Sequence, residues 1–408
     1  MSSTDIAEAV RADLPITRPV ADERPLVYLD SAATTLTPEP VIAAIAGYYR
    51  DVSASVHRGK HMLSDIASTR FEVVRSQTAT EIGAGTHETA FVPNTTAALN
   101  MVAAGLGLGP DDVVLAPLDV HHSNLLPWRR RARVRFIRLD DDATIDLDHY
   151  GELLAGRPAV VTVSHCSNVT GRYAPVALMA RMAHEAGALF VLDAAQSVPH
   201  GAIRLAGTGA DYAAFSAHKM LGPTGIGVLY GRLGALDPLL LGGGTVDWVD
   251  TEGIRPRDAP HHLEAGTPHV AGVYGLGAAL EYLRGLGWDE VAAHDAALAD
   301  ELYRLVAARP HLDPLGGVGA TDRAAIASLR MPPGTDADEV ARLLSDSYSV
   351  MCRSGKLCAQ PLVDAIGDGR PVLRISAYLY TRPEDLRTAF EALDEVLSVV
   401  GVPIGSRG

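Results

Sequence analysis

Short apolar segments that alternate with helical stretches constrain the fold of this chain more than any other feature of its sequence. They follow one another at residues 112–116, 134–139, 159–164, 188–192, 212–215 and 227–230. Several are apolar without interruption, as is typical of strands that are buried on both faces. Between two of them, residues 175–186 have a helical pattern, with Pro175 at the first position and Gly187 after the end. The pattern predicts an α/β fold in which a mostly parallel sheet has helices on both faces.

In the last third of the chain, the order of the expected helices and strands changes to one that is typical of a smaller α+β unit. The expected elements are helices at 270–283, 289–308 and 337–344 and strands at 325–331, 349–353 and 372–376. The final helix opens with Thr381-x-x-Glu384, the pattern of a capping box.

We therefore expect three parts in the 408 residues, a length that suits two domains. Residues 1–25 form an N-terminal arm that packs with the small domain. Residues 26–268 form a large domain, and residues 269–408 form a small C-terminal domain. The helix after His269 could bridge the two domains.

Composition and charge argue against several classes of protein. With 35 basic and 49 acidic residues, the net charge of −14 argues against binding to nucleic acid. The basic run at 129–133 is interpreted as a solvent-exposed face. No apolar run is long enough to cross a bilayer, and the first residues lack the pattern of a secretory signal. Three cysteines in such a chain are expected to be reduced thiols, which predicts a cytoplasmic protein.

Lysine is scarce, because only Lys60, Lys219 and Lys356 occur and arginine supplies every other basic residue. Arginine cannot replace lysine where an amine has to lose its proton and act as a nucleophile. Lys219 follows an apolar strand pattern, in Ser216-Ala217-His218-Lys219, and precedes a glycine-rich stretch. A lysine in a surface loop is the plainer interpretation. The setting nevertheless suits a Schiff base, with Ser216 and His218 placed to hold an anion.

Two polar segments at the ends of apolar patterns suit the same chemistry. Asp193 follows an apolar strand pattern, and a buried carboxylate needs a cation or a strong donor beside it. It could pair with the protonated pyridine nitrogen of pyridoxal phosphate (PLP), or equally serve as a helix N-cap. Asn94-Thr95-Thr96 opens an apolar helix, where free backbone N–H groups suit a phosphate. Capping of this helix by Thr95 is compatible with that role.

A histidine pair, His121 and His122, follows another strand pattern. Paired histidines occur in metal sites, but no cysteine or carboxylate cluster has zinc-like spacing, so we expect no metal. An imidazole beside a cofactor ring can instead stack on the ring and transfer protons.

A series of short motifs extends along nearly the whole chain. In order, they are Tyr28-Leu29-Asp30-Ser31-Ala32-Ala33, Val56-His57-Arg58-Gly59-x-His61, Thr95-Thr96, His121-His122-Ser123-Asn124, Ser167-Asn168-Val169-x-Gly171, Asp193-Ala194-Ala195-Gln196, Ser216-x-His218-Lys219, Glu264-Ala265-Gly266-Thr267-Pro268 and Cys358-Ala359-Gln360-Pro361. Together they resemble the class V aminotransferase-like, fold-type I PLP enzymes, and specifically the SufS-like (group II) cysteine desulfurases and selenocysteine lyases.

The resemblance implies PLP as the cofactor and a set of residues that bind it. Lys219 would form the Schiff base and shuttle the Cα proton, and His121 would stack on the ring and act as acid and base. Thr267 is expected to reach the phosphate of a neighbouring subunit, which implies a homodimer. The remaining cofactor contacts would be Asp193 at the pyridine nitrogen, Gln196 at the ring hydroxyl, and Thr95, Thr96, Ser216 and His218 at the phosphate.

The resemblance also implies a substrate site and a sulfur acceptor. Asn168 and Arg374 would bind the substrate carboxylate, for which a guanidinium fork is a natural receptor. Arg353 is expected beside them. Cys358 would accept the sulfur, because it lies in a polar loop, residues 353–360, rather than in an apolar segment. The cysteines interpreted as structural are Cys166 and Cys352.

The loop that carries Cys358 departs from the family pattern. The family usually has Arg-x-Gly-His-His-Cys, whereas this chain has Arg353-Ser354-Gly355-Lys356-Leu357-Cys358. Arg353 and Lys356 are nevertheless placed to favour a thiolate at Cys358. Two further departures are Val120, where a glutamate usually precedes the two histidines, and His269, where an asparagine usually follows Thr-Pro.

The resemblance implies a cysteine desulfurase, which converts L-cysteine to L-alanine and leaves the sulfur on Cys358 as a persulfide for an acceptor protein or thiol. L-Selenocysteine is a second candidate substrate. The main alternative is a PLP-dependent β-lyase or a related reaction on another amino acid in a specialised pathway, with Cys358 not catalytic. A catalytically silent protein that only binds a sulfur carrier is a third interpretation, which Lys219, Asp193 and His121 disfavour.

Overall fold

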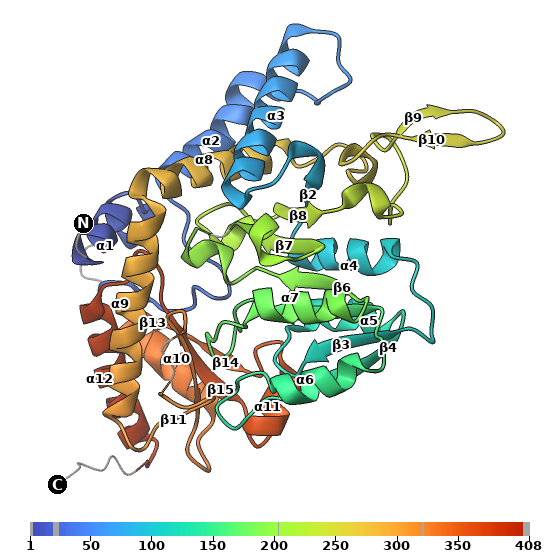
Figure 1. Ribbon diagram of the computed structural model, residues 1–408. Coiled ribbons are helices and arrows are strands. Elements are labelled where there is room, and N and C mark those ends of the chain that lie inside the picture. The colour runs from blue at the N-terminus through green and yellow to red at the C-terminus, as the bar shows by residue number, and fades with distance from the viewer. Residues whose placement is uncertain (1–2, 19–23, 203, 320–321, 403–408) are drawn as a thin grey trace.

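The computed structural model describes residues 3–18, 24–202, 204–319 and 322–402. A seven-stranded sheet lies at the centre of its larger part, in the order β2-β8-β7-β6-β5-β3-β4 (Figure 1). β8 runs antiparallel to β7 and β2, and the other neighbours are parallel, which confirms the predicted α/β fold with a mostly parallel sheet. The strands are β2 (Thr89–Val92), β3 (Val113–Pro117), β4 (Arg133–Ile137), β5 (Val160–Ser164), β6 (Leu189–Asp193), β7 (Tyr212–Ser216) and β8 (Gly227–Gly231).

Apolar side chains point to both faces of this sheet. Along β5, Val161 and Val163 belong to one hydrophobic cluster, and Val160 belongs to a second cluster on the opposite face. Burial on both faces explains why the strand segments are apolar without interruption. The helices that contribute to the first cluster include α6 (Leu147–Leu154) and α7 (Val176–Glu185), and those that contribute to the second include α4 (Thr95–Gly105) and α5 (Leu126–Arg129).

Three helices and a hairpin extend the larger part beyond β2 (Figure 1). The helices α2 (Glu39–Gly47) and α3 (Met62–Ile82) pack against α8 (Val270–Leu286). The hairpin of β9 (Val246–Val249) and β10 (Ile254–Pro256) stands away from the body of the molecule. Its apolar side chains are about half exposed: 51% for Trp248, 57% for Val249 and 48% for Ile254.

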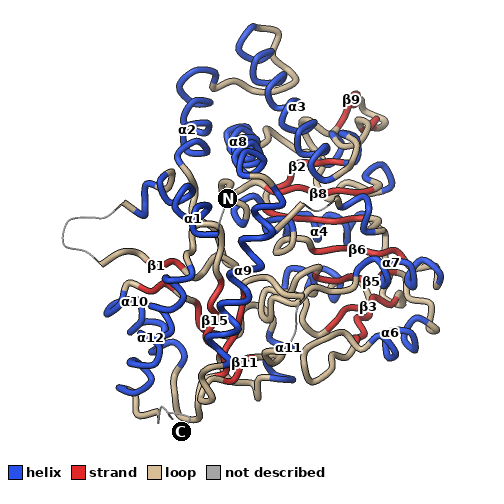
Figure 2. The backbone as a smooth tube through the Cα atoms, turned by 60° about the vertical axis from the view of Figure 1, so that its left-hand side comes forward, coloured by secondary structure: helices blue, strands red, loops and turns tan. Residues whose placement is uncertain are grey.

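The smaller part is built on an antiparallel sheet in the order β11-β12-β15-β14. The helices α9 and α12 contact each other in this part (Figure 2), and side chains of both helices and of β15 share one apolar core. A short parallel pair joins β1, from the beginning of the chain, to β13. The elements are α9 (Trp288–Ala307), β11 (Asp313–Pro314), β12 (Ile326–Arg330), α10 (Ala337–Tyr348), β13 (Val350–Met351), β14 (Arg353–Gly355), α11 (Gln360–Ile366), β15 (Val372–Ser376), α12 (Pro383–Val399) and β1 (Val27–Tyr28).

The N-terminal helix α1 (Ser3–Ala12) contacts both parts. Val10 is buried in the core of the larger part, whereas Arg11 lies 3.6 Å from Asp385 at the start of α12. The predicted limits of arm, large domain and small domain at residues 25/26 and 268/269 stay predictions. No helix among the described residues is long and apolar enough to span a membrane.

Two local predictions are wrong. The final helix has Arg382 as its N-cap, and the carboxylate of Asp385, rather than that of Glu384, accepts a hydrogen bond from the backbone N–H of Arg382 at 2.9 Å. Residues Arg353–Gly355, assigned to the Cys358 loop, form β14 because their backbone groups pair with β15. The loop is therefore shorter than the sequence pattern predicts.

Candidate active site

A cavity at the carboxyl ends of β5, β6 and β7 brings most of the predicted site residues together. This edge is where ligands generally bind in parallel α/β sheets. The smaller part closes the cavity with residues of β14, β15 and the Cys358 loop. The predicted residues that line it are Thr95, Thr96, His121, Asn168, Asp193, Gln196, Ser216, His218, Lys219, Arg353, Cys358 and Arg374.

The amino-terminal end of α4 forms the anion-binding side of the cavity. Asn94 caps this helix, because its Oδ1 accepts a hydrogen bond from the backbone N–H of Ala97 at 2.9 Å. The alternative of capping by Thr95 is therefore wrong, and Thr95 is hydrogen-bonded instead to Ser216, with 2.7 Å between the hydroxyl oxygens. The hydroxyl of Thr96 is likewise 2.7 Å from that of Ser123. These hydroxyls and the positive end of the helix dipole together suit a phosphate.

A buried carboxylate, Asp193, and a partly buried amine, Lys219, lie at the ends of the two central strands, β6 and β7. Asp193 accepts a hydrogen bond from the backbone N–H of Ala195 at 3.0 Å, and no described helix begins directly after it, so the N-cap alternative is wrong. Burial raises the pKa of Asp193, against the lowering effect of Lys219. Burial also lowers the pKa of Lys219 to about 8, although the charge of Asp193 raises it. A substantial fraction of the amine is therefore neutral near pH 8, as a nucleophile requires.

His121 is held as a neutral imidazole. Burial, together with a smaller effect of the positive charge of Lys219, lowers its pKa to about 3. Its Nδ1 accepts a hydrogen bond from the backbone N–H of Ser123 at 3.1 Å. In the neutral ring the proton is then assigned to Nε2, which can donate to a bound group.

Arg374 is fixed in the wall of the cavity by hydrogen bonds from two of its five N–H donors. Its Nη2 lies 2.8 Å from Oδ1 of Asp30, and its Nη1 donates to the backbone carbonyl of Asn168 at 3.1 Å. Its Nε is buried and has no hydrogen-bond partner among the described residues. The guanidinium has further N–H donors beyond its two hydrogen bonds, and because Arg374 lines the cavity, it is suited to bind a substrate carboxylate. Asp30, which orients Arg374, was not predicted, although its motif was recognised.

The Cys358 loop is fastened to the larger part by hydrogen bonds. The amide of Asn168 donates to the carbonyl of Leu357 at 2.9 Å, and the backbone N–H of His122 donates to the carbonyl of Cys358 at 2.7 Å. The backbone of His122, the second histidine of the pair, therefore helps to hold the Cys358 loop in place. The position of His122 in the sequence did not indicate this role. Lys356 forms an ion pair with Asp364 at 2.6 Å.

The three cysteines differ in their surroundings, and none is in a disulfide. Cys358 is partly exposed in the cavity wall. Burial raises the pKa of Cys352 to about 12 and that of Cys166 above its ordinary value, so both are poor nucleophiles. The basic run is largely exposed, as predicted, since Arg129, Arg130 and Arg131 all face solvent.

Thr267 lies outside this cavity, at a second hollow that also contains Arg58 and Arg257. A buried ion pair supports the segment before it. The guanidinium of Arg75 is 2.6 and 2.9 Å from the two carboxylate oxygens of Glu264, which also accepts a hydrogen bond from the backbone N–H of Phe91. Thr267 is therefore placed on the surface rather than over the cofactor site of its own chain.

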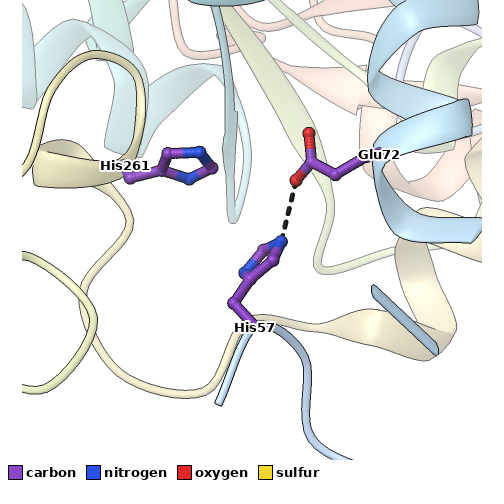
Figure 3. Close-up of side chains that lie close together, drawn as sticks. All are labelled: His57, Glu72 and His261. Carbon is purple, nitrogen blue, oxygen red and sulfur yellow. Dashed lines mark hydrogen bonds and ion pairs between the residues drawn. The ribbon is translucent and has the colours of Figure 1, made fainter. Parts of the chain in front are cut away.

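Beside this hollow, His57, Glu72 and His261 are close enough to suggest a metal site (Figure 3). Glu72 is already bound, however, because His57 Nε2 lies 2.9 Å from one oxygen and Nε of Arg75 lies 2.9 Å from the other. Hydrogen bonds from His57 and Arg75 lower the pKa of Glu72 to about 2, although its burial raises it. The cluster is therefore explained by hydrogen bonds and ion pairs without a metal.

The residues of the first cavity fit PLP. The buried carboxylate of Asp193 suits a protonated ring nitrogen, the amine of Lys219 suits an aldehyde, and the start of α4 suits a phosphate. Sequence reasoning missed Asn94 as the cap, although an asparagine directly before a helix is a recognisable signal.

The chain matches the aminotransferase class-V family over residues 27–388. It is 40% identical to a probable cysteine desulfurase of Halobacterium salinarum, over 96% of this chain and 97% of that protein. It is 39% identical to a cysteine desulfurase of Haloferax volcanii, over 95% and 96%. The apo structure of a cysteine desulfurase from Thermococcus onnurineus is similar at a TM-score of 0.90 and 34% identity, over 96% of this chain and 98% of that one.

Proposed function

The chain belongs to the class V aminotransferase family, and we propose that it is a PLP-dependent cysteine desulfurase, which converts L-cysteine to L-alanine with transfer of the sulfur to Cys358. The observation that carries this proposal is the composition of one cavity. Its wall contains the amine of Lys219, the buried carboxylate of Asp193, the guanidinium of Arg374 and the thiol of Cys358. Full-length similarity to proteins named cysteine desulfurase supports it.

Some residues of the cavity bind the cofactor and the substrate, and Lys219 transfers protons. When bound, PLP draws electrons away from the Cα of the amino acid. Asp193, at the end of β6, would pair with the positively charged ring nitrogen of PLP, and the start of α4 would bind the phosphate of PLP. Nζ of Lys219 takes the proton from Cα and returns one, which its pKa of about 8 permits near neutral pH. Arg374 binds the substrate carboxylate and so fixes the orientation of the amino acid.

The sulfur step belongs to Cys358. Its Sγ attacks the sulfur of the substrate, so that a sulfur–sulfur bond forms and the Cβ–S bond breaks. The electron pair of the broken bond stays with the carbon fragment, which takes up a proton and leaves as alanine. The terminal sulfur of the persulfide is then available to an acceptor protein or thiol. Because the reaction needs a reduced thiol, the cytoplasm is the compartment that we propose.

A homodimer of the SufS-like (group II) type is part of this proposal. Thr267 lies away from the cavity of its own chain, which leaves it available to the phosphate bound by a second copy. The exposed apolar side chains of Trp248, Val249 and Ile254 on the β9–β10 hairpin suit burial against that copy.

Mass spectrometry after treatment with L-cysteine tests the proposed function. We expect one added sulfur on Cys358 and L-alanine in solution. Cys358→Ser is expected to abolish alanine formation while the visible absorbance of PLP is retained, and Lys219→Ala is expected to remove that absorbance. Pyruvate and ammonia in place of alanine would instead identify a β-lyase. A direct comparison of L-cysteine with L-selenocysteine in the Cys358→Ser variant tests the selenocysteine alternative.

A further inference from the structure

The turn that carries Cys358 has an unfavourable backbone conformation. The φ angles of Leu357 and Cys358 are 51° and 55°, in the left-handed region that side chains other than glycine rarely adopt. Two consecutive residues of this kind persist only where the surroundings hold them in place. Specific contacts must therefore hold this turn.

The side chain of Leu357 is the main anchor of the turn. It is 5% exposed and packs in a small apolar cluster, separate from the two cores of the larger part. The cluster draws on the turn after β5, on α11 and on β15, so Leu357 is buried where the two parts of the molecule meet. Its other buried members are Val169, Leu315, Ala359, Leu362, Val363 and Val372.

Backbone hydrogen bonds complete the fixation, whereas the neighbouring ion pair adds little. The carbonyl groups of Leu357 and Cys358 accept hydrogen bonds from Asn168 and His122. Lys356 and Asp364 are 32% and 49% exposed in their side chains, and a pair with such exposure contributes weakly to stability. The apolar contact of Leu357 therefore holds the turn more firmly than the charge of Lys356.

We propose that Leu357 is a positioning residue, which holds the Cys358 thiol within reach of the substrate sulfur by burying its own side chain. The inference rests on the proposed function, because it gives Cys358 the sulfur-accepting role.

The test compares holoenzymes of wild type, Leu357→Ala, Leu357→Met and Leu362→Ala. Leu362 is 0% exposed in the same cluster but does not adjoin the thiol, so it is the matched control for lost packing. For Leu357→Ala we expect kcat for alanine formation to fall about 100-fold, as for a misplaced reacting group, with KM for L-cysteine within about threefold of wild type. Leu357→Met, which keeps an apolar side chain of similar volume, should stay within about threefold of wild type.

A second measurement does not depend on activity. The rate at which iodoacetamide alkylates Cys358, followed by mass spectrometry of the peptide, should rise at least about fivefold in Leu357→Ala and remain near wild type in Leu362→Ala. The inference is overturned if Leu357→Ala alkylates at the wild-type rate, or if Leu362→Ala loses as much kcat. Absence of alanine formation in the wild type would refute the proposed function, while the alkylation rates would still decide whether Leu357 holds the turn.

Discussion

Replacing Glu264 by Gln isolates the contribution of one buried charge to the stability of this fold. Arg75 is only 1% exposed, and Glu264 binds its two Nη atoms, whereas Glu72 binds its Nε and, at 3.2 Å, its Nη2. Oε1 of Glu264 also accepts the backbone N–H of Phe91 at 2.7 Å. Glutamine retains an oxygen for Phe91 and Nη1 of Arg75, but its NH2 group takes the place of the oxygen that accepts from Nη2, so the substitution removes the negative charge and one hydrogen bond of Arg75.

The expected loss of stability depends on which charges remain beside Arg75 in the variant. Removing one partner of a buried ion pair costs about 3–5 kcal/mol, because the other ion stays buried without compensation. Glu72 still faces the guanidinium, and a partly exposed pair offsets about 1 kcal/mol of that cost. We therefore expect Glu264→Gln to lower the free energy of unfolding by about 2–4 kcal/mol.

The pH dependence of this effect has a definite sign. Burial alone would raise the pKa of Glu264, but the charge of Arg75 and the hydrogen bonds at the carboxylate lower it below its ordinary value. A depressed pKa in the folded state gives stability that is present above the unfolded pKa of about 4.3 and is lost as the pH falls through the folded value. The difference between variant and wild type should therefore shrink only in acid.

Hydrogen exchange at the amides of β2 and α3 is the suitable assay, because it reports local opening free energies in a chain too large for assured two-state unfolding. The double variant Arg75→Met/Glu264→Gln is the control, and it should be more stable than Glu264→Gln alone since it buries no unpaired charge. An exchange free energy for Glu264→Gln within about 0.5 kcal/mol of wild type would refute the reasoning.

Three further outcomes are expected. Because the pKa of Lys219 is lowered to about 8, apoprotein should bind PLP faster as the pH rises through about 8, as measured by stopped-flow absorbance; a rate that is flat from about pH 6.5 to 9 contradicts this. Asp30→Asn removes the charge 2.8 Å from Nη2 of Arg374 and should raise KM for L-cysteine about tenfold in steady-state assays, whereas an unchanged KM excludes the orienting role. Gly171→Ala should lower the free energy of unfolding by at least about 2 kcal/mol, because Gly171 has a φ of 69° and a Cβ there would lie 2.8 Å from the carbonyl oxygen of Ala324; an unchanged melting temperature contradicts it.

The strands of the central sheet could be predicted from the sequence because burial on both faces leaves an uninterrupted apolar signal. A strand that is stabilised mainly by hydrogen bonds to one partner strand has a less apolar sequence and is therefore harder to predict. Arg353–Gly355 looks like a polar loop, yet it forms β14 because β15 supplies its hydrogen bonds. The final helix was located correctly, but its first turn depends on which acidic side chain reaches the backbone, and two candidates adjoin each other in the sequence.

The residues that line the cavity could be predicted from motifs, whereas the residues that orient them could not. Lys219 and Asp193 stand out because their chemistry is unusual at the end of an apolar strand. Asp30 and Leu357 act through contacts with residues far along the chain, and nothing in their own neighbourhood distinguishes them from ordinary structural residues. Their roles depend on contacts between the two parts of the molecule. The periodicity of apolar residues along the sequence does not indicate such contacts.

The side chain of Asn94 caps α4 through the backbone N–H of Ala97. The hydroxyl of Ser216 in turn accepts a hydrogen bond from the backbone N–H of Thr95 at 2.9 Å and lies 2.7 Å from the Thr95 hydroxyl. Thr95 begins α4 and Ser216 ends β7, so these bonds join the start of the helix to the strand that precedes Lys219. The anion-binding side and the amine side of the cavity are therefore held in one arrangement.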